Sequence, residues 1–360
     1  MDITVALSLC EALGLQYPIV QAPMAGVSTP EMAAAVTEAG ALGSISVGAA
    51  TPQQAEAMIA KTQALTRGAI NVNVFCHAPV QRHAAREQAW IERFRELFAR
   101  YGAALPDELQ EIYQTFLGNH AMFDVIAKAK PAAVSFHFGL PEAQVIEQFK
   151  QRGIVTFATA TNVTEALAVA EHKIDFIVAQ GMEAGGHRGQ FDPLTFDPQM
   201  STLTLVQAIR QHTSHPVIAA GGIMDGAGMA AMMQLGATGV QMGTAFVLCP
   251  ESAANDAYRA ALKQSNETAT VMTAAISGRQ ARCLRNAFCR FSQDVRSDEI
   301  PDYPLTYSLG KALAAAAAAK NEPGFGAQWA GQGAGLAREM PAGQLVRTIV
   351  QEWQNQSRCL

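Results

Sequence analysis

The sequence predicts an α/β fold: a (β/α)8 TIM barrel with a helical insertion after its third strand and a helical appendage at its C-terminal end. Eight short β-rich runs alternate with segments of helical period from about residue 17 to residue 250. Several of these runs are apolar on both faces, as in 174–178, which is typical of parallel strands covered by helices. This alternation favours a closed barrel over an open, doubly wound sheet.

The expected strands and helices follow one another in regular order. Several of the helical segments open with proline or with an Asn or Asp cap, which is how helices commonly begin. We expect strands at 17–22, 43–47, 70–75, 133–137, 154–158, 176–180, 217–220 and 239–242, and helices at 30–39, 52–65, 141–151, 162–171, 203–211 and 225–235.

One connection between strands, from residue 75 to residue 133, is much longer than the others. Its sequence predicts a charged amphipathic helix at 81–99 and a second, short helix at 107–117. After residue 250 the alternation stops, and the chain reads as helices that fold back over the barrel mouth. The expected division is therefore a barrel domain at 1–250, with its insertion at about 77–120, and a helical appendage at 251–360.

The composition indicates a globular protein of the cytoplasm. Of the 360 residues, 49% are hydrophobic and 16% charged, which excludes a disordered chain. The net charge of −5 leaves no basic surplus for nucleic-acid binding. The alanine run at 312–319 is too short to cross a membrane, and the N-terminus lacks the basic stretch of a signal peptide.

Metal and disulfide sites are not expected either. The six cysteines contain no CxxC pair, which fits a reducing compartment rather than a disulfide scaffold or a zinc site. His212 and His215 have the spacing of a metal-binding pair, but no third ligand lies near them in the sequence.

Glycines gather at the ends of the last two expected strands. The seventh strand ends in AAGGI (219–223) and the eighth in GVQMGTAF (239–246). In (β/α)8 enzymes the chemistry takes place at these strand ends, and the loops after strands seven and eight commonly bind phosphate. Glycine lets the backbone approach a ligand closely, although one such pair would equally fit a tight turn. Two pairs at neighbouring strand ends favour a phosphate site.

Flavin mononucleotide (FMN) suits this phosphate site better than a dinucleotide does. The sequence has neither GxGxxG after its first strand nor a GxxxxGK[ST] loop. Met24, in QAPMAG, would place its backbone against a flat ring. Asn73 and Gln180 end the third and sixth strands, where each amide could hydrogen-bond the ring edge or the ribityl chain. Each could instead satisfy loop backbone, the more common role for a single strand-end amide.

Two histidines lie at the ends of expected strands. His137 ends the fourth strand in SFHFG, and His187 lies in GMEAGGHRG after the sixth. A neutral imidazole near a flavin can accept a proton at physiological pH. A packed strand-end histidine explains His137 about equally well. For His187, a polar residue between glycines in a mouth loop, function is the better explanation.

Two tyrosines and a lysine recur at a spacing of four in DYPLTYSLGKAL. Tyr303, Tyr307 and Lys311 would therefore share one face of a helix. Two phenols and an ammonium group on one face suit a small anionic substrate. The spacing alone is better explained by an ordinary amphipathic helix with a solvated lysine.

Taken together, these segments resemble a known family. QAPMAGVSTPEMAAAVTEAGALGSI, VSFHFG, GMEAGGHRG, AAGGI and GVQMGTAF, in this order, are similar to the nitronate monooxygenase family, formerly called 2-nitropropane dioxygenase. The resemblance covers most of residues 15–250. DYPLTYSLGKAL also resembles the class I members, which act on propionate 3-nitronate.

The resemblance implies an FMN-dependent barrel enzyme whose site residues can be assigned by position. His187 matches the histidine regarded as the catalytic base of the family. The substrate-site positions of class I match His137, Tyr303, Tyr307 and Lys311, with Tyr113 of the insertion added on a looser alignment. The FMN-binding positions match Asn73, Gln180, Gly185, Gly222, Gln241, Met242, Gly243 and Thr244.

The implied activity is the oxidative denitration of alkyl nitronates with O2. A nitronate, which is a nitroalkane already deprotonated at carbon, gives one electron to FMN. The resulting flavin semiquinone reduces O2, and denitration yields an aldehyde plus nitrite or nitrate. His187 would act as a base toward a neutral nitroalkane or as a hydrogen-bond donor to a nitronate, and the sequence leaves both roles open.

Three other functions share features with this sequence. An NAD(P)H-dependent FMN reductase of the enoyl-acyl carrier protein reductase or quinone reductase type shares the AGG and GGH elements. The Tyr/Lys face disfavours it, because that face suits a small anion rather than an acyl chain, and the bulky insertion at 77–120 would restrict the mouth. An IMP dehydrogenase-like barrel would need a cysteine in the loop at 181–200, which has none. A flavin-binding protein without turnover is disfavoured by the clustered histidines and tyrosines.

Overall fold

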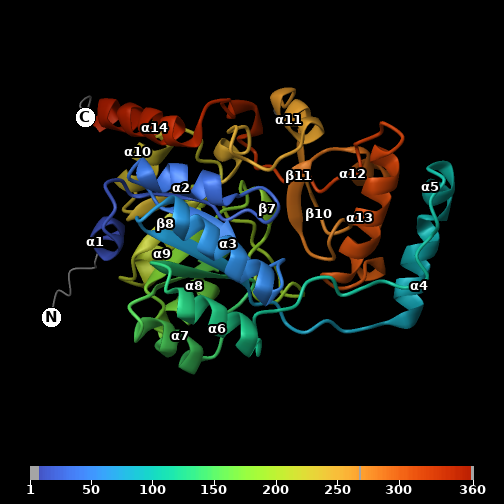
Figure 1. Cartoon of the computed structure of the whole chain (residues 1–360), viewed down its shortest axis with the longest axis horizontal. Helices are drawn as coiled ribbons and strands as arrows, with labels where there is room; N and C mark the ends of the chain where they lie inside the picture. The colour runs from blue at the N-terminus through green and yellow to red at the C-terminus, as the bar shows by residue number, and fades with distance from the viewer. Residues whose placement is uncertain (1–7, 267–268, 358–360) are drawn as a thin grey trace.

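The centre of the molecule is a ring of parallel strands (Figure 1). The computed structural model describes residues 8–266 and 269–357. A bridge between Val20 and Leu42 brings the last strand of the ring back to the first, so the predicted barrel is confirmed. Around the ring the order is β1 (Ile19–Gln21), β9 (Gly239–Met242), β8 (Val217–Ala220), β6 (Phe176–Gln180), β5 (Val155–Ala160), β4 (Ala133–His137), β3 (Ile70–Phe75) and β2 (Gly43–Ser46).

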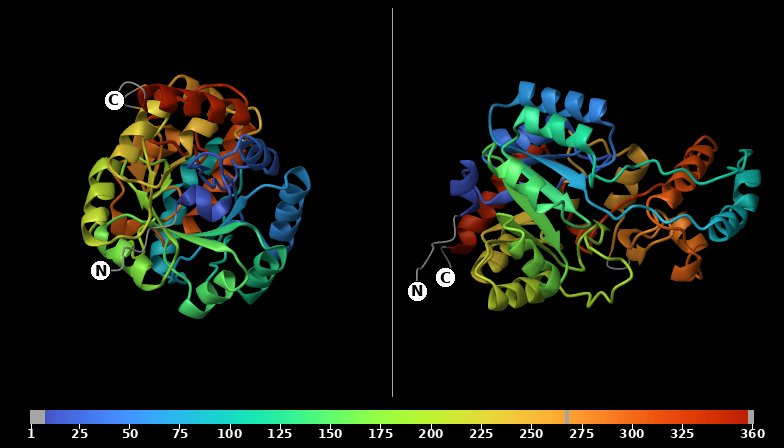
Figure 2. Two further views of the ribbon diagram at one scale, coloured as in Figure 1. Left: turned by 90° about the vertical axis from the view of Figure 1, so that its left-hand side faces the viewer. Right: turned by 90° about the horizontal axis from the view of Figure 1, so that it is seen from below.

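Helices surround this ring on the outside, as the view along the barrel axis shows (Figure 2, left). Hydroxyl caps begin several of them: the Thr29 and Ser201 side chains each accept a hydrogen bond from the third backbone N–H that follows. In the described part of the chain the ring consists of α2 (Pro30–Glu38), α3 (Pro52–Leu65), α6 (His120–Ala129), α7 (Ala143–Lys150), α8 (Val163–Glu171), α9 (Thr202–His212), α10 (Gly226–Gln234) and α14 (Ala342–Ser357).

Two apolar clusters hold the barrel together. The larger one fills the space between the strands and the surrounding helices. The smaller one lies inside the ring and includes Val20, Phe157 and Phe176. The short helix α1 (Leu9–Leu13) buries Leu9 against this inner cluster. Strands with buried side chains on both faces explain the continuous apolar runs in the sequence.

The insertion after β3 forms an arm at the opposite end of the molecule from α1 (Figure 1). The helix expected at 81–99 is divided at Phe94 into α4 (Ala84–Arg93) and α5 (Arg95–Arg100). The prediction of a helix at 107–117 is wrong, because that segment is irregular. Its backbone N–H groups bond to other parts of the chain instead: Phe116 N–H donates to the Phe75 carbonyl and Gln110 N–H to the Ser308 hydroxyl.

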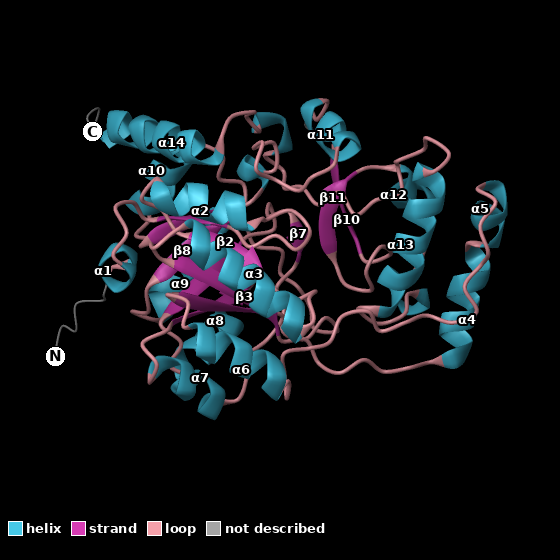
Figure 3. Ribbon diagram, in the orientation of Figure 1, coloured by secondary structure: helices cyan, strands magenta, loops and turns pink. Residues whose placement is uncertain are grey.

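The region after residue 250 contains strands as well as the expected helices (Figure 3). Strand β11 (Ala281–Leu284) pairs antiparallel with β10 (Thr270–Thr273) on one side and with β7 (Gly186–His187), in the loop after β6, on the other. This pairing fastens the appendage to the barrel mouth. Its other elements are the 3-10 turns η2 (Ser297–Glu299) and η3 (Ala334–Leu336) and the helices α11 (Asp256–Lys263), α12 (Ala287–Phe291) and α13 (Leu305–Ala318), whereas the 3-10 turn η1 (Thr244–Phe246) follows β9 directly.

The insertion and the appendage share one apolar core. Trp90 and Phe94 from the insertion pack with Phe288 and Leu309 from the appendage. Figure 2 (right) shows both segments extending together from the strand ends of the barrel. Within the ranges described above, no helix is both long enough and apolar enough to span a membrane.

Candidate functional site

A cavity of about 550 Å³ lies where the carboxyl ends of the barrel strands meet the appendage. Strand ends and loops form its floor, and residues of α13 and of the segment around Trp329 line it from the appendage side. Every residue that the sequence predicts for the site lines this one cavity: Met24, Asn73, Tyr113, His137, Gln180, Gly185, His187, Gly222, Gln241, Met242, Gly243, Thr244, Tyr303, Tyr307 and Lys311.

Glycine backbone forms one wall of the cavity. Gly221 and Gly222 follow β8 with φ angles of +124° and +70°, which residues with side chains rarely adopt. A Cβ added to Gly185 would lie 2.5 Å from the backbone nitrogen of Gly331, so these two segments touch without side chains between them. The Gly331 N–H donates to the Thr244 hydroxyl at 3.0 Å. The wall therefore offers peptide groups to a ligand, as a phosphate ester requires.

The side-chain amides of Asn73 and Gln180, at two strand ends, already form hydrogen bonds within the protein. The Asn73 nitrogen donates to the Ser135 carbonyl and hydroxyl, each at 3.1 Å, and the Asn73 oxygen accepts from the Ser46 hydroxyl. The Gln180 nitrogen donates to the His187 carbonyl at 2.8 Å, and its oxygen accepts from the Gly189 N–H at 2.7 Å. Both amides hold neighbouring backbone, and both still line the cavity.

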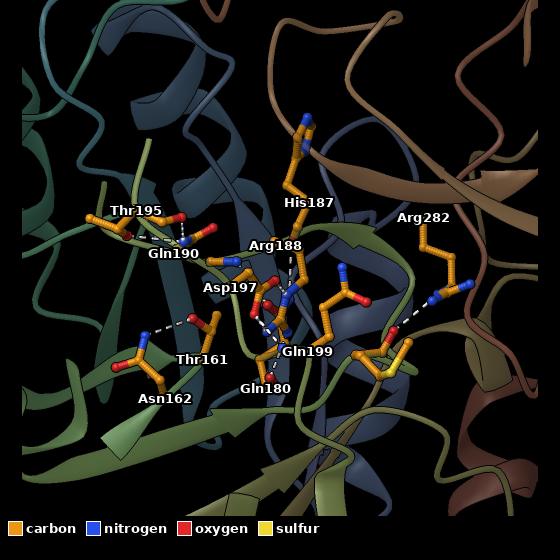
Figure 4. Close-up of polar contacts among 12 residues, drawn as sticks. Thr161, Asn162, Gln180, His187, Arg188, Gln190, Thr195, Asp197, Gln199 and Arg282 are labelled. Atoms are coloured by element: carbon orange, nitrogen blue, oxygen red, sulfur yellow. Dashed lines mark hydrogen bonds and ion pairs between the residues drawn. The ribbon is translucent and has the colours of Figure 1, made fainter. Parts of the chain in front are cut away.

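The loop that carries His187 is fixed at both ends (Figure 4). Buried Arg188 forms a two-point ion pair with Asp197, at 2.8 and 2.9 Å, and also donates to the Gln180 carbonyl. The side chain of His187 points away from this ion pair, toward the appendage. There its Nε2 lies 3.0 Å from the hydroxyl of Ser277, and its ring lies 5.0 Å from that of Trp329.

His137 occupies the neighbouring strand end. Its Nδ1 lies 3.0 Å from the Thr159 hydroxyl. A Cβ on Gly189 would come within 2.8 Å of the His137 ring, so the last glycine of GGHRG makes room for it. Burial lowers the pKa of His137 to about 3, and the charges of Arg279 and Arg188 act in the same direction. His137 is therefore a neutral ring at physiological pH.

A buried cation lies behind these histidines. The Arg279 guanidinium donates to the backbone carbonyls of Gln190 and Phe191 and lies 4.4 Å from the centre of the Phe138 ring. Burial lowers the pKa of Arg279 to about 10, so it keeps its charge at neutral pH. Loss of solvation holds the pKa of His187 well below its usual value, and the positive charge of Arg279 acts in the same direction.

Aromatic rings and one lysine complete the site. The rings of Tyr303 and Tyr307 lie 5.5 and 6.0 Å from that of His187. Burial raises the pKa of both phenols, so both stay protonated and able to donate. Lys311, which is exposed at the mouth, places its ammonium group 4.8 Å from the centre of the Tyr113 ring. Tyr307 and Lys311 lie on α13 and line the cavity. The prediction that Tyr303 shares their helix face is wrong, because α13 begins at Leu305 and Tyr303 reaches the cavity from the segment before it.

Three residues of the site were not predicted from the sequence. Ser277, Arg279 and Trp329 reach it from the appendage, and β11 brings Ser277 beside His187 across 90 positions of sequence. Trp329 stands between small residues in GAQWAGQG, which is the one local signal that could have identified it. Ser277 and Arg279 lie in an ordinary turn sequence. No group of metal-binding side chains occurs within 8–266 and 269–357.

The whole chain is similar to known proteins. The sequence model of the family described as nitronate monooxygenase matches residues 7–352. A nitronate monooxygenase of Paraburkholderia phytofirmans is 52% identical over 345 residues, which cover 96% of this chain and 94% of that protein.

Solved protein structures are similar to this one as well. The nitroalkane oxidase of Streptomyces ansochromogenes superposes with a TM-score of 0.87 at 36% identity, over 96% of this chain and 98% of that one. FabK of Thermotoga maritima superposes with a TM-score of 0.73 at 28% identity, over 97% and 96%. The matched family model spans nearly the whole sequence, and the chain belongs to the nitronate monooxygenase family.

Proposed function

We propose that this enzyme oxidises alkyl nitronates with O2 on bound FMN, with propionate 3-nitronate as substrate, and yields an aldehyde plus nitrite or nitrate. The observation that carries the proposal is the polarity of the cavity: an ammonium group and two protonated phenols face it from α13 and the residues just before it, and neutral histidines lie on the barrel side. A small anion with a second acidic group fits such a cavity.

The glycine wall and the strand-end amides fit FMN. The backbone around Gly222 and from Gln241 to Thr244 would hold the phosphate, because its glycines bring peptide groups to the cavity surface. Asn73 and Gln180 would lie at the ring or the ribityl chain, beside the backbone that they already hold. Met24 would place its backbone against the ring. Bound FMN supplies the electron-transfer chemistry between substrate and O2.

The residues of the chain bind and enclose the substrate. Lys311 and the hydroxyls of Tyr303 and Tyr307 would bind the carboxylate or nitro oxygens by charge-assisted hydrogen bonds. The rings of Trp329 and Phe138 cover the buried side of His187. Such a lining excludes bulk water from the reacting carbon, which protects reactive intermediates from side reactions.

Oxygen uptake tests the proposal. Purified protein with its yellow chromophore should consume O2 rapidly with propionate 3-nitronate and without NAD(P)H. Mass spectrometry of the chromophore released by denaturation should give FMN. Yellow protein that takes up no O2 with propionate 3-nitronate or simple alkyl nitronates would contradict the proposal.

An NAD(P)H-dependent FMN reductase is the second candidate, because the AGG and GGH elements of the sequence are shared with such enzymes. Anaerobic mixing with NADPH separates the two functions. A reductase bleaches its flavin absorbance rapidly under these conditions, whereas an enzyme that draws electrons from the nitronate itself shows little change.

A further inference from the structure

Ser277 is the side chain that bonds His187 from the appendage. It is fully buried in a turn, in which the N–H groups of Ser277 and Gly278 both donate to the Ala274 carbonyl. A Cβ on Gly278 would lie 2.5 Å from the Tyr303 nitrogen, so this turn packs directly against the start of α13. The position of the Ser277 hydroxyl is therefore set by the backbone and is independent of any ligand.

The hydrogen bonds around Ser277 determine where its one proton goes. Its Oγ lies 2.9 Å from the carbonyl oxygen of Arg279, which can only accept a hydrogen bond. The Arg279 N–H donates back to the same Oγ at 3.3 Å. If the hydroxyl donated to His187 instead, the buried Arg279 carbonyl would lose this donor, which is costly. The Ser277 proton thus belongs to the carbonyl, and Oγ accepts from His187.

We propose that Ser277 is a positioning residue, which fixes His187 as the tautomer protonated at Nε2 and leaves the Nδ1 lone pair for the cavity. In this arrangement Nε2 donates to Ser277 Oγ over 3.0 Å. Nδ1 can then accept a proton from carbon or from a bound ligand, but it cannot donate a hydrogen bond to a nitronate oxygen. His187 acts as a base toward neutral nitroalkanes and leaves anion binding to Lys311 and the tyrosines.

The surroundings of His187 keep this ring neutral before substrate binds. His137 lies beside it on the barrel side, His77 and Arg279 behind it, and the phenols of Tyr303 and Tyr307 on the appendage side. Loss of solvation and the positive charge of Arg279 both lower the pKa of His187. In the resting enzyme His187 is therefore a neutral ring with one proton, and one of its nitrogens is free to accept a proton from the substrate.

Nitrogen NMR of the holoenzyme tests the tautomer directly. With 15N-labelled histidine, long-range proton–nitrogen spectra distinguish the two neutral tautomers, and His187→Asn identifies the His187 signals. We expect Nε2 to be protonated and Nδ1 bare. His77 is an internal reference of the opposite kind, because its Nδ1 lies 3.1 Å from the Ala78 carbonyl and must donate to it. His187 signals of the Nδ1–H tautomer or of the cation would overturn the proposal.

Ser277→Ala tests the role of the hydroxyl. The His187 signals should move toward a mixture of tautomers. The value of kcat/KM for a neutral nitroalkane should then fall at least about tenfold, because a fraction of the enzyme molecules carries the His187 proton on Nδ1, the nitrogen that must be free to act as the base. With a nitronate, which needs no base, kcat/KM should change by less than about threefold. Ser292→Ala is the matched control, since Ser292 is a buried serine of the appendage whose hydroxyl donates to the Phe288 carbonyl.

The tautomer and the activity can fail separately. The assignment of Nδ1 as a base rests on the proposed function, whereas the NMR readout does not. A wild-type enzyme with the Nε2–H tautomer but no O2 uptake with nitronates would overturn only the proposed function. Unchanged His187 signals in folded Ser277→Ala would overturn the positioning role even if the activity were intact.

Discussion

Lys311 carries the charge of the cavity mouth, where it lies over the Tyr113 ring. We expect Lys311→Met to raise KM for propionate 3-nitronate by about tenfold, because a hydrogen bond to a charged group contributes about 1.5 kcal/mol or more. Steady-state O2 uptake measures the change, and kcat should fall less than KM rises. Lys320→Met removes an exposed lysine beyond the end of α13 and should leave both constants unchanged. Equal effects of the two variants would contradict a specific role for Lys311.

Gly189 lies two residues after His187 in the sequence and packs against the ring of His137. A Cβ there would lie 2.4 Å from the Thr159 methyl group and 2.8 Å from the His137 ring, so the strand end must move to accept it. We expect Gly189→Ala to lower the unfolding free energy by about 1–3 kcal/mol and to reduce turnover. Gly228→Ala is the control: a Cβ at that helical position meets only ordinary contacts. Urea denaturation measures the unfolding free energy of both variants, and equal values for the two would contradict this explanation.

At the residue scale, sequence reasoning succeeded where a local pattern marked the site. His187 between glycines and the Tyr/Lys spacing of DYPLTYSLGKAL were such patterns, and their residues line the cavity, although Tyr303 lies before α13 rather than on it. Ser277 and Arg279 had no such pattern, because the pairing of β11 with β7 gives them their importance. A contact across 90 positions cannot be read from either segment alone.

Helix α14 completes the ring of the barrel although it follows the appendage in sequence. Ile349 is fully buried against α2 and α10, and its carbonyl lies 2.6 Å from where a Cβ of Gly226 would be. We expect Ile349→Ala to lower the unfolding free energy by about 2–5 kcal/mol. Gln351→Ala, on the exposed face of the same helix, should change it by less than about 0.5 kcal/mol. Urea denaturation of both variants decides whether this helix is part of the barrel core.

Element prediction failed where tertiary contacts outweigh the local pattern. Residues 107–117 have helical spacing, but their N–H groups bond to Phe75 and Ser308 on other elements, so no helix forms. The buried strands of the barrel were predicted within a few residues, because their apolar runs depend little on distant partners. Strands β10 and β11 have no such run, and their pairing with each other and with β7 makes them strands.

At the scale of the whole molecule, the site lies between two cores. The barrel core positions the strand ends, and the core shared by the insertion and the appendage positions α13 and Trp329. Phe138, which follows β4, belongs to the second core and touches the rings of His137 and His187. The two halves of the cavity are thus held together by aromatic contacts at its centre. This arrangement buries several histidines that must stay neutral.

Those buried histidines lower the stability of the folded protein as the pH decreases. Burial lowers the pKa of His77 to about 4, against 6.5 for an exposed histidine. Between these values the unfolded chain binds a proton that the folded protein does not, so the unfolding free energy is highest above pH 6.5 and falls as the pH decreases. Each such histidine contributes up to about 1.4 kcal/mol per pH unit.

Removing one of them should therefore flatten the pH dependence. We expect the unfolding free energy of His77→Phe to fall less steeply between pH 6 and pH 4.5 than that of the wild type, by up to about 1.4 kcal/mol per pH unit, whatever its value at pH 7. Urea denaturation of the FMN-loaded proteins at several pH values measures the slope. His212→Gln, at an exposed helix end, should keep the wild-type slope. Parallel curves for wild type and His77→Phe would show that His77 is already protonated in the folded protein and that its burial does not limit acid stability.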